Sequence, residues 1–187
     1  MDRLDAAHTL RPVGIGDGAL LARAYLRNRA HLAPWEPLRD DDFFSEAWHE
    51  RDIAHYVEDA SRGRNVRFVI TSDDGEIRGR VNLNNIVRGA FCSADLGYWV
   101  DSIAQGRGVA TRAVEWVLRH AQEALSLHRV QAATLVHNVA SQRVLDANGF
   151  ERIGLAPRYL RIAGAWQDHV LFQRLLEEQV TVRAERP

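Results

Sequence analysis

Seven consecutive residues in the middle of the chain have the pattern of a turn that binds phosphate groups. Two glycines alternate with other residues just ahead of an amphipathic segment, so several backbone N–H groups can converge on one anion at the positive end of a helix dipole. Glycine permits a positive φ and lets a ligand approach the backbone without meeting a Cβ atom. The residues are Gln105, Gly106, Arg107, Gly108, Val109, Ala110 and Thr111.

The segments beside this turn must position it. Val109, Ala113 and Val117 recur at helical spacing and predict a buried helix face directly after the turn. The preceding residues 92–100 have the composition of a strand. Because a strand, a glycine-rich turn and a helix also occur in ordinary α/β units, these local patterns leave a phosphate site and a plain connection both open.

Several motifs together resemble the GCN5-related N-acetyltransferases (GNAT). The segment 105–110 has the form Q-x-x-G-x-A and resembles their pyrophosphate signature, and 95–100 (DLGYWV) resembles their fourth strand. The later segments 137–141 (HNVAS) and 148–150 (NGF) resemble their N-x-x-S and N-G-F elements. Within the superfamily the chain most resembles the RimJ/RimL branch, which acetylates N-terminal amines of ribosomal proteins. The segments most similar to RimJ are 32–37, 85–89 and 164–171.

The resemblance spans nearly the whole chain and implies one α/β domain over residues 1–187. The GNAT fold has a central, mostly antiparallel twisted sheet, here expected with about seven strands, flanked by helices and split between strands 4 and 5. Alternation and turn signals predict strands near 9–13, 67–71, 77–87, 92–100, 128–136, 151–162 and 166–174. A polar tail is expected at 179–187.

GNAT enzymes use acetyl-CoA, and the resemblance to them implies which residues of this chain bind the cofactor. The turn at 105–111 would anchor the pyrophosphate, and the backbone of Trp99 and Val100 would hold the pantetheine as an added strand. Asn138 is expected to bind the pantetheine arm, and Ser141 to hydrogen-bond or protonate the leaving sulfur. An asparagine N-cap followed by a serine is also what any short helix favours, so a purely structural role for both stays open.

The reaction also needs a base and a site that binds the acceptor, and the sequence offers candidates for both. Asp95 stands where many relatives carry a strand-borne glutamate, so we expect it to act as the base through water, with a solvated strand aspartate as the alternative. Ile153 occupies the position of another glutamate common in relatives, so that role is absent or moved. The expected acceptor-binding residues are Trp35, Glu36, Tyr98, Tyr159 and Asp168, of which the last two could be structural.

Composition limits the partners. A formal charge of −1 provides no large basic surface for nucleic acid. The single cysteine, Cys92, excludes an internal disulfide, and no apolar run is long enough to span a membrane, so a cytoplasmic protein is expected. The histidines lack metal-ligand spacing, so no metal is expected.

The sequence therefore predicts an acetyl-CoA-dependent transferase that acetylates the N-terminal α-amine of a protein, foremost a ribosomal protein with alanine or serine first. Direct attack in a ternary complex needs no covalent enzyme intermediate. The alternatives are an enzyme for a small amine such as an antibiotic or polyamine, and a module that binds acyl-CoA without catalysis. Monomer and homodimer both stay open.

Overall fold

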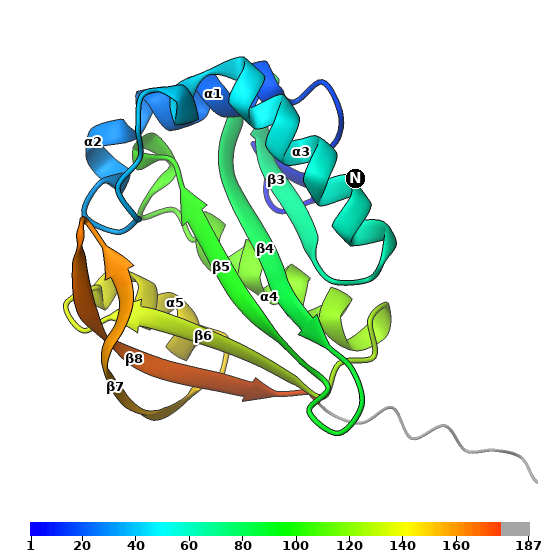
Figure 1. The fold of residues 1–187 in the computed structure, drawn as a ribbon. Helices are drawn as coiled ribbons and strands as arrows, with labels where there is room; N and C mark the ends of the chain where they lie inside the picture. The colour runs from blue at the N-terminus through cyan, green and yellow to red at the C-terminus, as the bar shows by residue number, and fades with distance from the viewer. Residues whose placement is uncertain (177–187) are drawn as a thin grey trace, which may run out of the picture.

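The computed structural model describes residues 1–176, so the expected tail at 179–187 lies outside the described part of the chain. These residues form both helices and strands (Figure 1). In chain order they are β1 (Asp2–Arg3), β2 (His8–Pro12), α1 (Gly18–Arg27), α2 (Arg29–Leu32), η1 (Asp42–Phe44), α3 (Glu46–Ser61), β3 (Val66–Ser72), β4 (Ile77–Val87), β5 (Ser93–Val100), η2 (Ser102–Ala104), α4 (Val109–Glu123), β6 (Arg129–Leu135), α5 (Val139–Ala147), β7 (Glu151–Ile162) and β8 (Ala165–Leu175).

All strands of the described residues belong to one sheet of eight, in the order β1-β2-β3-β4-β5-β6-β8-β7. The expected mixed α/β fold with a mostly antiparallel sheet is confirmed, but the expected count of about seven strands is wrong. The additional strand is β1, which pairs only Asp2 with Leu10 and Arg3 with Thr9. Two residues are too few to show alternation, so the sequence carried no signal for this strand.

The sheet is split at its centre, between β5 and β6. These two strands pair in parallel from Ser93 and Arg129 as far as Leu96 and Ala132, and then the ladder ends while both strands continue. The edge of β5 beyond Leu96 therefore faces β6 without a ladder partner. This is the split expected between strands 4 and 5, which are β5 and β6 once β1 is counted.

Helices cover the two faces of the sheet unequally (Figure 1). On one face, α1 and α3 pack over β3 and β4 around buried residues such as Tyr25 and Ile53. On the other face, α4 lies against β4 and β5, where Val114 and Val117 are fully buried. Burial of these apolar side chains fixes α4, and with it the turn at its N-terminus, against the centre of the sheet.

Capping side chains set where two of the helices begin. Ser45 accepts a hydrogen bond from the backbone N–H of Trp48 at 3.2 Å, and Asn138 accepts one from that of Ser141 at 3.1 Å. The cap at Asn138 fixes the start of α5 beside the split. Among the helices of residues 1–176, none has the length and apolar content needed to cross a membrane.

Candidate active site

The glycine-rich turn has the backbone conformation that its sequence requires. Gly106 and Gly108 have φ of +69° and +72°, a region that L-residues with a Cβ adopt only with strain. Gly108 is the N-cap of α4, and its carbonyl accepts the backbone N–H of Arg112 at 3.1 Å. The N–H groups before Arg112 belong to the first turn and have no intrahelical acceptor, so they can bind an anion.

A long cavity begins at this turn and runs to the split in the sheet. This cofactor channel has a volume of about 690 Å³ and lies between the end of β5, the start of α4 and the start of α5. Of the residues expected to bind cofactor, all but Arg107 line it, and that side chain is exposed. The lining includes Trp99, Val100, Gln105, Gly106, Gly108, Val109, Ala110, Thr111, Asn138 and Ser141, together with His31 and Arg143, which the sequence analysis missed.

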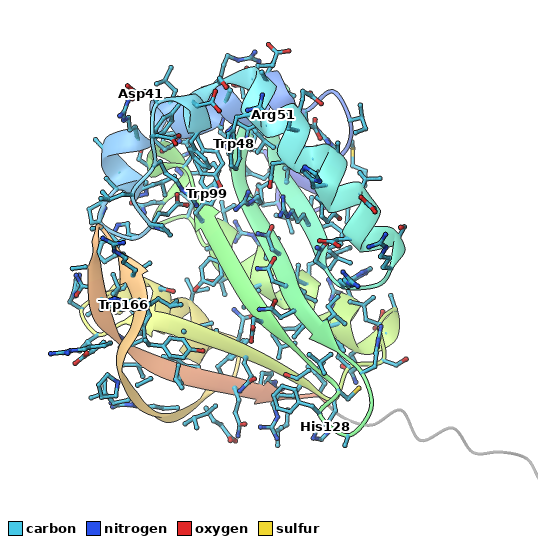
Figure 2. The ribbon with its side chains drawn as sticks, in the orientation of Figure 1. Asp41, Trp48, Arg51, Trp99, His128 and Trp166 are labelled. Atoms are coloured by element: carbon cyan, nitrogen blue, oxygen red, sulfur yellow. The ribbon has the colours of Figure 1, made fainter. Side chains whose placement is uncertain are left out.

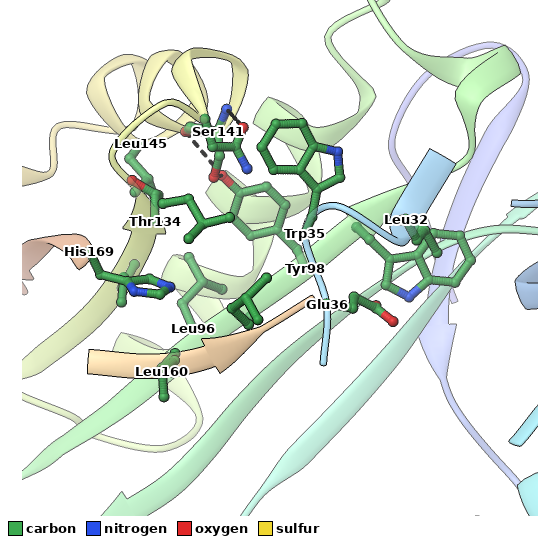
Figure 3. A pocket seen from close by; sticks show the side chains of 17 residues that line it. Leu32, Trp35, Glu36, Leu96, Tyr98, Thr134, Ser141, Leu145, Leu160 and His169 are labelled. Atoms are coloured by element: carbon green, nitrogen blue, oxygen red, sulfur yellow. Dashed lines mark hydrogen bonds between the residues drawn. The ribbon is translucent and has the colours of Figure 1, made fainter. Parts of the chain in front are cut away.

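A second, smaller cavity of about 180 Å³ adjoins the channel where β5 and β6 separate. This acceptor pocket is lined by residues of β5, β6, β7 and β8 and by the segment after α2 (Figure 3). The two cavities share six lining residues, so they meet inside the molecule. The shared residues are Leu32, Trp35, Tyr98, Trp99, Asn138 and Ser141.

A hydrogen-bonded pair lies at the junction of the two cavities. The Tyr98 hydroxyl is 2.8 Å from Ser141 Oγ and also donates to the Ser141 carbonyl oxygen at 3.1 Å (Figure 3). Burial raises the pKa of Tyr98 to about 12, against a smaller lowering by the hydrogen bond to Ser141, so the phenol keeps its proton at neutral pH. Both residues are predicted from the sequence as site residues, Tyr98 on the acceptor side and Ser141 at the leaving sulfur, but their contact with each other is not predicted.

One carboxylate stands among the residues that line the two cavities, and it is Glu36. Its side chain is only 18% exposed, and Arg39 Nε lies 3.8 Å from its Oε2. Burial raises the pKa of Glu36, while the charges of Arg80 and Arg39 offset part of that rise. Trp35 lies beside it with its ring 5.5 Å from that of His137, so the expected pair Trp35 and Glu36 lies at the acceptor pocket.

Besides Arg107, three of the expected site residues lie outside the lining of both cavities. Asp95 is exposed on β5 and accepts a hydrogen bond from Asn85 Nδ2 at 2.8 Å, so its role as the base stays a prediction without a contact to support it. The Asp168 carboxylate accepts the backbone N–H of Arg158 at 2.8 Å, where β7 departs from regular pairing. Tyr159 is 46% exposed and packs its ring 5.7 Å from that of His169.

A buried carboxylate holds the loop that leads into the turn. The side chain of Asp101 is fully buried; it accepts hydrogen bonds from Arg27 Nε at 2.8 Å and from the backbone N–H of Ile103 at 3.2 Å. Burial alone would raise the pKa of Asp101, but these hydrogen bonds outweigh it and lower the pKa below its ordinary value.

We expect Asp101→Asn to lower the free energy of unfolding by about 2–3 kcal/mol at pH 7, because it removes the buried charge that pairs with both Arg27 and Arg78. A lowered native pKa means that the stabilisation is complete above the unfolded pKa of about 3.9 and is lost as the pH falls through the native value. Urea unfolding of both proteins at pH 7 and pH 3 measures this. An equal difference at both pH values would contradict the role of the charge.

Comparison with known proteins identifies the family. A family model described as an acetyltransferase (GNAT) domain matches residues 8–151. The chain belongs to the GNAT family of acetyltransferases. This confirms the family that its motifs resemble.

Relatives of this GNAT acetyltransferase modify ribosomal proteins. The [ribosomal protein uS5]-alanine N-acetyltransferase of Escherichia coli K12 is 37% identical over 157 residues, which cover 83% of this chain and 80% of that protein. The structure of ribosomal-protein-S5-alanine acetyltransferase from Vibrio fischeri matches with a TM-score of 0.87 and 35% identity over 91% of this chain and 97% of that one. RimJ of Mycobacterium smegmatis, solved in complex with CoA-disulfide, matches with a TM-score of 0.86 and 38% identity. The match covers 92% of this chain and 84% of that one.

The cavities of this GNAT acetyltransferase fit a coenzyme A thioester. The N–H groups around Gly108 can receive its diphosphate, and the unpaired edge of β5 can receive the amides of its pantetheine. Its thioester end would then lie at the Tyr98–Ser141 pair, where the channel meets the acceptor pocket. No cluster of histidine, cysteine, aspartate and glutamate side chains within residues 1–176 is arranged to hold a metal ion.

Proposed function

We propose that this protein transfers the acetyl group of acetyl-CoA to the N-terminal α-amine of a ribosomal protein whose first residue is alanine or serine. The observation that carries the proposal is the meeting of two cavities at the split of the sheet. The larger fits the cofactor, and the smaller, which contains Glu36, fits the end of a polypeptide. The names of the E. coli and V. fischeri relatives support a ribosomal protein as the acceptor.

The reactivity of the acceptor favours a terminal amine over a lysine. A terminal α-amine has a pKa of about 8, so making it neutral at pH 7 costs about 1.4 kcal/mol, against about 4.6 kcal/mol for a lysine with a pKa of about 10.4. The site therefore does not need a strongly activated base to deprotonate an α-amine.

Four residues that line the two cavities have defined tasks in this function. When bound, acetyl-CoA supplies an acetyl group activated as a thioester. The Glu36 carboxylate attracts the cationic terminus into the pocket, and Trp35 packs beside it. Ser141 Oγ donates a hydrogen bond to the leaving sulfur, and the Tyr98 hydroxyl holds Ser141 in place.

Glu36→Gln should raise the KM for a peptide about tenfold and leave the KM for acetyl-CoA unchanged, because it removes the charge that meets the terminus.

The Glu36→Gln variant should also melt at a higher temperature than the wild type at pH 7. A raised native pKa means that the charged carboxylate destabilises the fold at neutral pH, and this cost disappears as the pH falls below the unfolded value of about 4.3. Melting curves at pH 7 and pH 4 test the second effect.

The experiment that tests the function is release of CoA thiol by the purified protein with a panel of acceptors. The panel contains peptides that begin with alanine or serine, the same peptides already acetylated, a polyamine and an aminoglycoside. We expect turnover with the free peptides alone. Turnover with the small amines alone would overturn the polypeptide acceptor, and acetyl-CoA binding without thiol release from any acceptor would indicate a non-catalytic module.

Mass spectrometry of ribosomal proteins from a strain that lacks the gene identifies the acceptor. One N-terminus that begins with alanine or serine should lose its acetyl group in that strain. Complete acetylation of these N-termini in the deletion strain would contradict a ribosomal acceptor.

A further inference from the structure

His169 lines the acceptor pocket and has none of the tasks described above. It lies on β8, where it pairs with Leu135 of β6 and Ala156 of β7, and it is only 3% exposed. Figure 3 shows the imidazole ring directed into the pocket, on the side opposite Glu36. The ring is therefore placed where an amine bound in the pocket would meet it.

The hydrogen bond of the ring fixes its tautomer. His169 Nδ1 lies 2.9 Å from the carbonyl oxygen of Gln167. A carbonyl oxygen only accepts, so Nδ1 carries the proton and, in the neutral ring, Nε2 keeps a free lone pair. Within residues 1–176 the hydrogen bond of the ring is made by Nδ1, so the Nε2 lone pair is available to a bound molecule.

We propose that His169 is the base that takes the proton of the attacking amine, an inference that rests on the proposed function. The terminus that Glu36 attracts as a cation first loses one proton to solvent, and the neutral nitrogen then bonds to the acetyl carbon as the bond from that carbon to sulfur breaks. The proton that the nitrogen loses passes to His169 Nε2 and later to solvent. The sulfur takes a proton from the Ser141 hydroxyl, and Ser141 takes one back from solvent as His169 releases its proton there, so charges and protons balance.

The surroundings of the ring favour this role over the other candidates. The neighbours Leu135 and Ala156 are uncharged, and the ring of Tyr159 packs against the imidazole from β7. The other titratable groups in the pocket are Glu36, which has Arg39 beside it, and Tyr98.

Neither of those two groups is as well suited to accept the proton. The Glu36 carboxylate has Arg39 Nε 3.8 Å from its Oε2 and is already occupied with the charged terminus. Tyr98 keeps its own proton at neutral pH, since burial raises the pKa of its phenol to about 12. Asp95, expected from the sequence to be the base, does not line the pocket.

The test uses the full-length protein with a peptide acceptor. His169→Asn retains an N–H that can donate to the Gln167 carbonyl but removes Nε2, and His169→Ala leaves room for added imidazole. The control is His128→Asn, because His128 is exposed at the far end of the sheet (Figure 2). The measurements are kcat, the dependence of kcat/KM on pH, calorimetric affinity for acetyl-CoA and thermal melting.

We expect His169→Asn to lower kcat about 100-fold without changing acetyl-CoA affinity, and His128→Asn to retain wild-type kcat. At acid pH the slope of log kcat/KM should be at least two in the wild type, because the amine nitrogen and Nε2 must both be free of a proton, and lower by one in His169→Asn. Added imidazole should raise the kcat of His169→Ala.

Three results would overturn the proposal. They are a His169→Asn kcat above about a third of the wild-type value, a lower kcat without rescue by imidazole, and a wild-type slope of one. The last result decides even if the variants fail to fold. If the wild type acetylates only a small amine, the proposed function fails, and the same pH profile measured with that amine still decides the role of His169.

Discussion

Gly108→Glu should lower the affinity for acetyl-CoA at least about 100-fold. Any side chain at this position must adopt a φ of +72°, and its Cβ would lie 2.8 Å from Arg112 Nη1. The new carboxylate would also stand where the N–H groups at the start of α4 receive the diphosphate, and two like charges repel each other there. Isothermal calorimetry with acetyl-CoA measures the loss directly.

Gly89→Glu is the matched control for this substitution. Gly89 has a φ of +73°, and a Cβ there would meet nothing within 4 Å. It lies between β4 and β5 and lines neither cavity, so it shares the backbone strain of Gly108→Glu without touching the cofactor channel. We expect both variants to melt at lower temperatures and only Gly108→Glu to lose binding. Equal affinities in the two variants would contradict the assignment of the turn.

Ser141→Ala should lower kcat about 100-fold and leave acetyl-CoA affinity nearly unchanged. The hydroxyl is 2.8 Å from the Tyr98 hydroxyl at the junction of the cavities, where the sulfur must acquire a proton as it leaves. Tyr98→Phe should have a smaller effect, about tenfold, because it removes the group that holds Ser141 in place. Steady-state kinetics and calorimetry on the three variants, including the double one, separate catalysis from binding.

The double variant tests whether the two hydroxyls act as one unit. If Tyr98 acts through Ser141, the double variant should be no slower than Ser141→Ala alone. A further tenfold loss in the double variant would show that the two residues act independently. That outcome would leave Ser141 in its role and remove the positioning role of Tyr98.

The strands, helices and cofactor turn could be predicted because their signals are local. Gly106 and Gly108 predict a turn with positive φ, because glycine adopts that conformation without strain. Asn138 predicts the start of a helix, because asparagine is a favoured N-cap residue. The two-residue strand β1 could not be predicted, since it exists only through its pairing with β2.

The residues of the acceptor pocket were predicted less well, because the pocket is formed by contacts between segments that are distant in the sequence. Tyr98 and Ser141 are far apart in the sequence, and their hydroxyls meet only because α5 begins beside the split between β5 and β6. Asp95 was selected from its position on the strand, but it pairs with Gln131 in the part of β5 before the split and does not line the pocket. His169 could have been noticed as a lone polar position in the otherwise apolar segment 169–172 (HVLF).

The most direct measurement is the site of acetylation in a peptide that begins with alanine and also contains an internal lysine. The purified protein is incubated with acetyl-CoA at pH 7, and tandem mass spectrometry locates the added group. The account predicts an acetyl group on the α-nitrogen and none on the lysine side chain. Acetylation of the lysine with a free α-amine would contradict it.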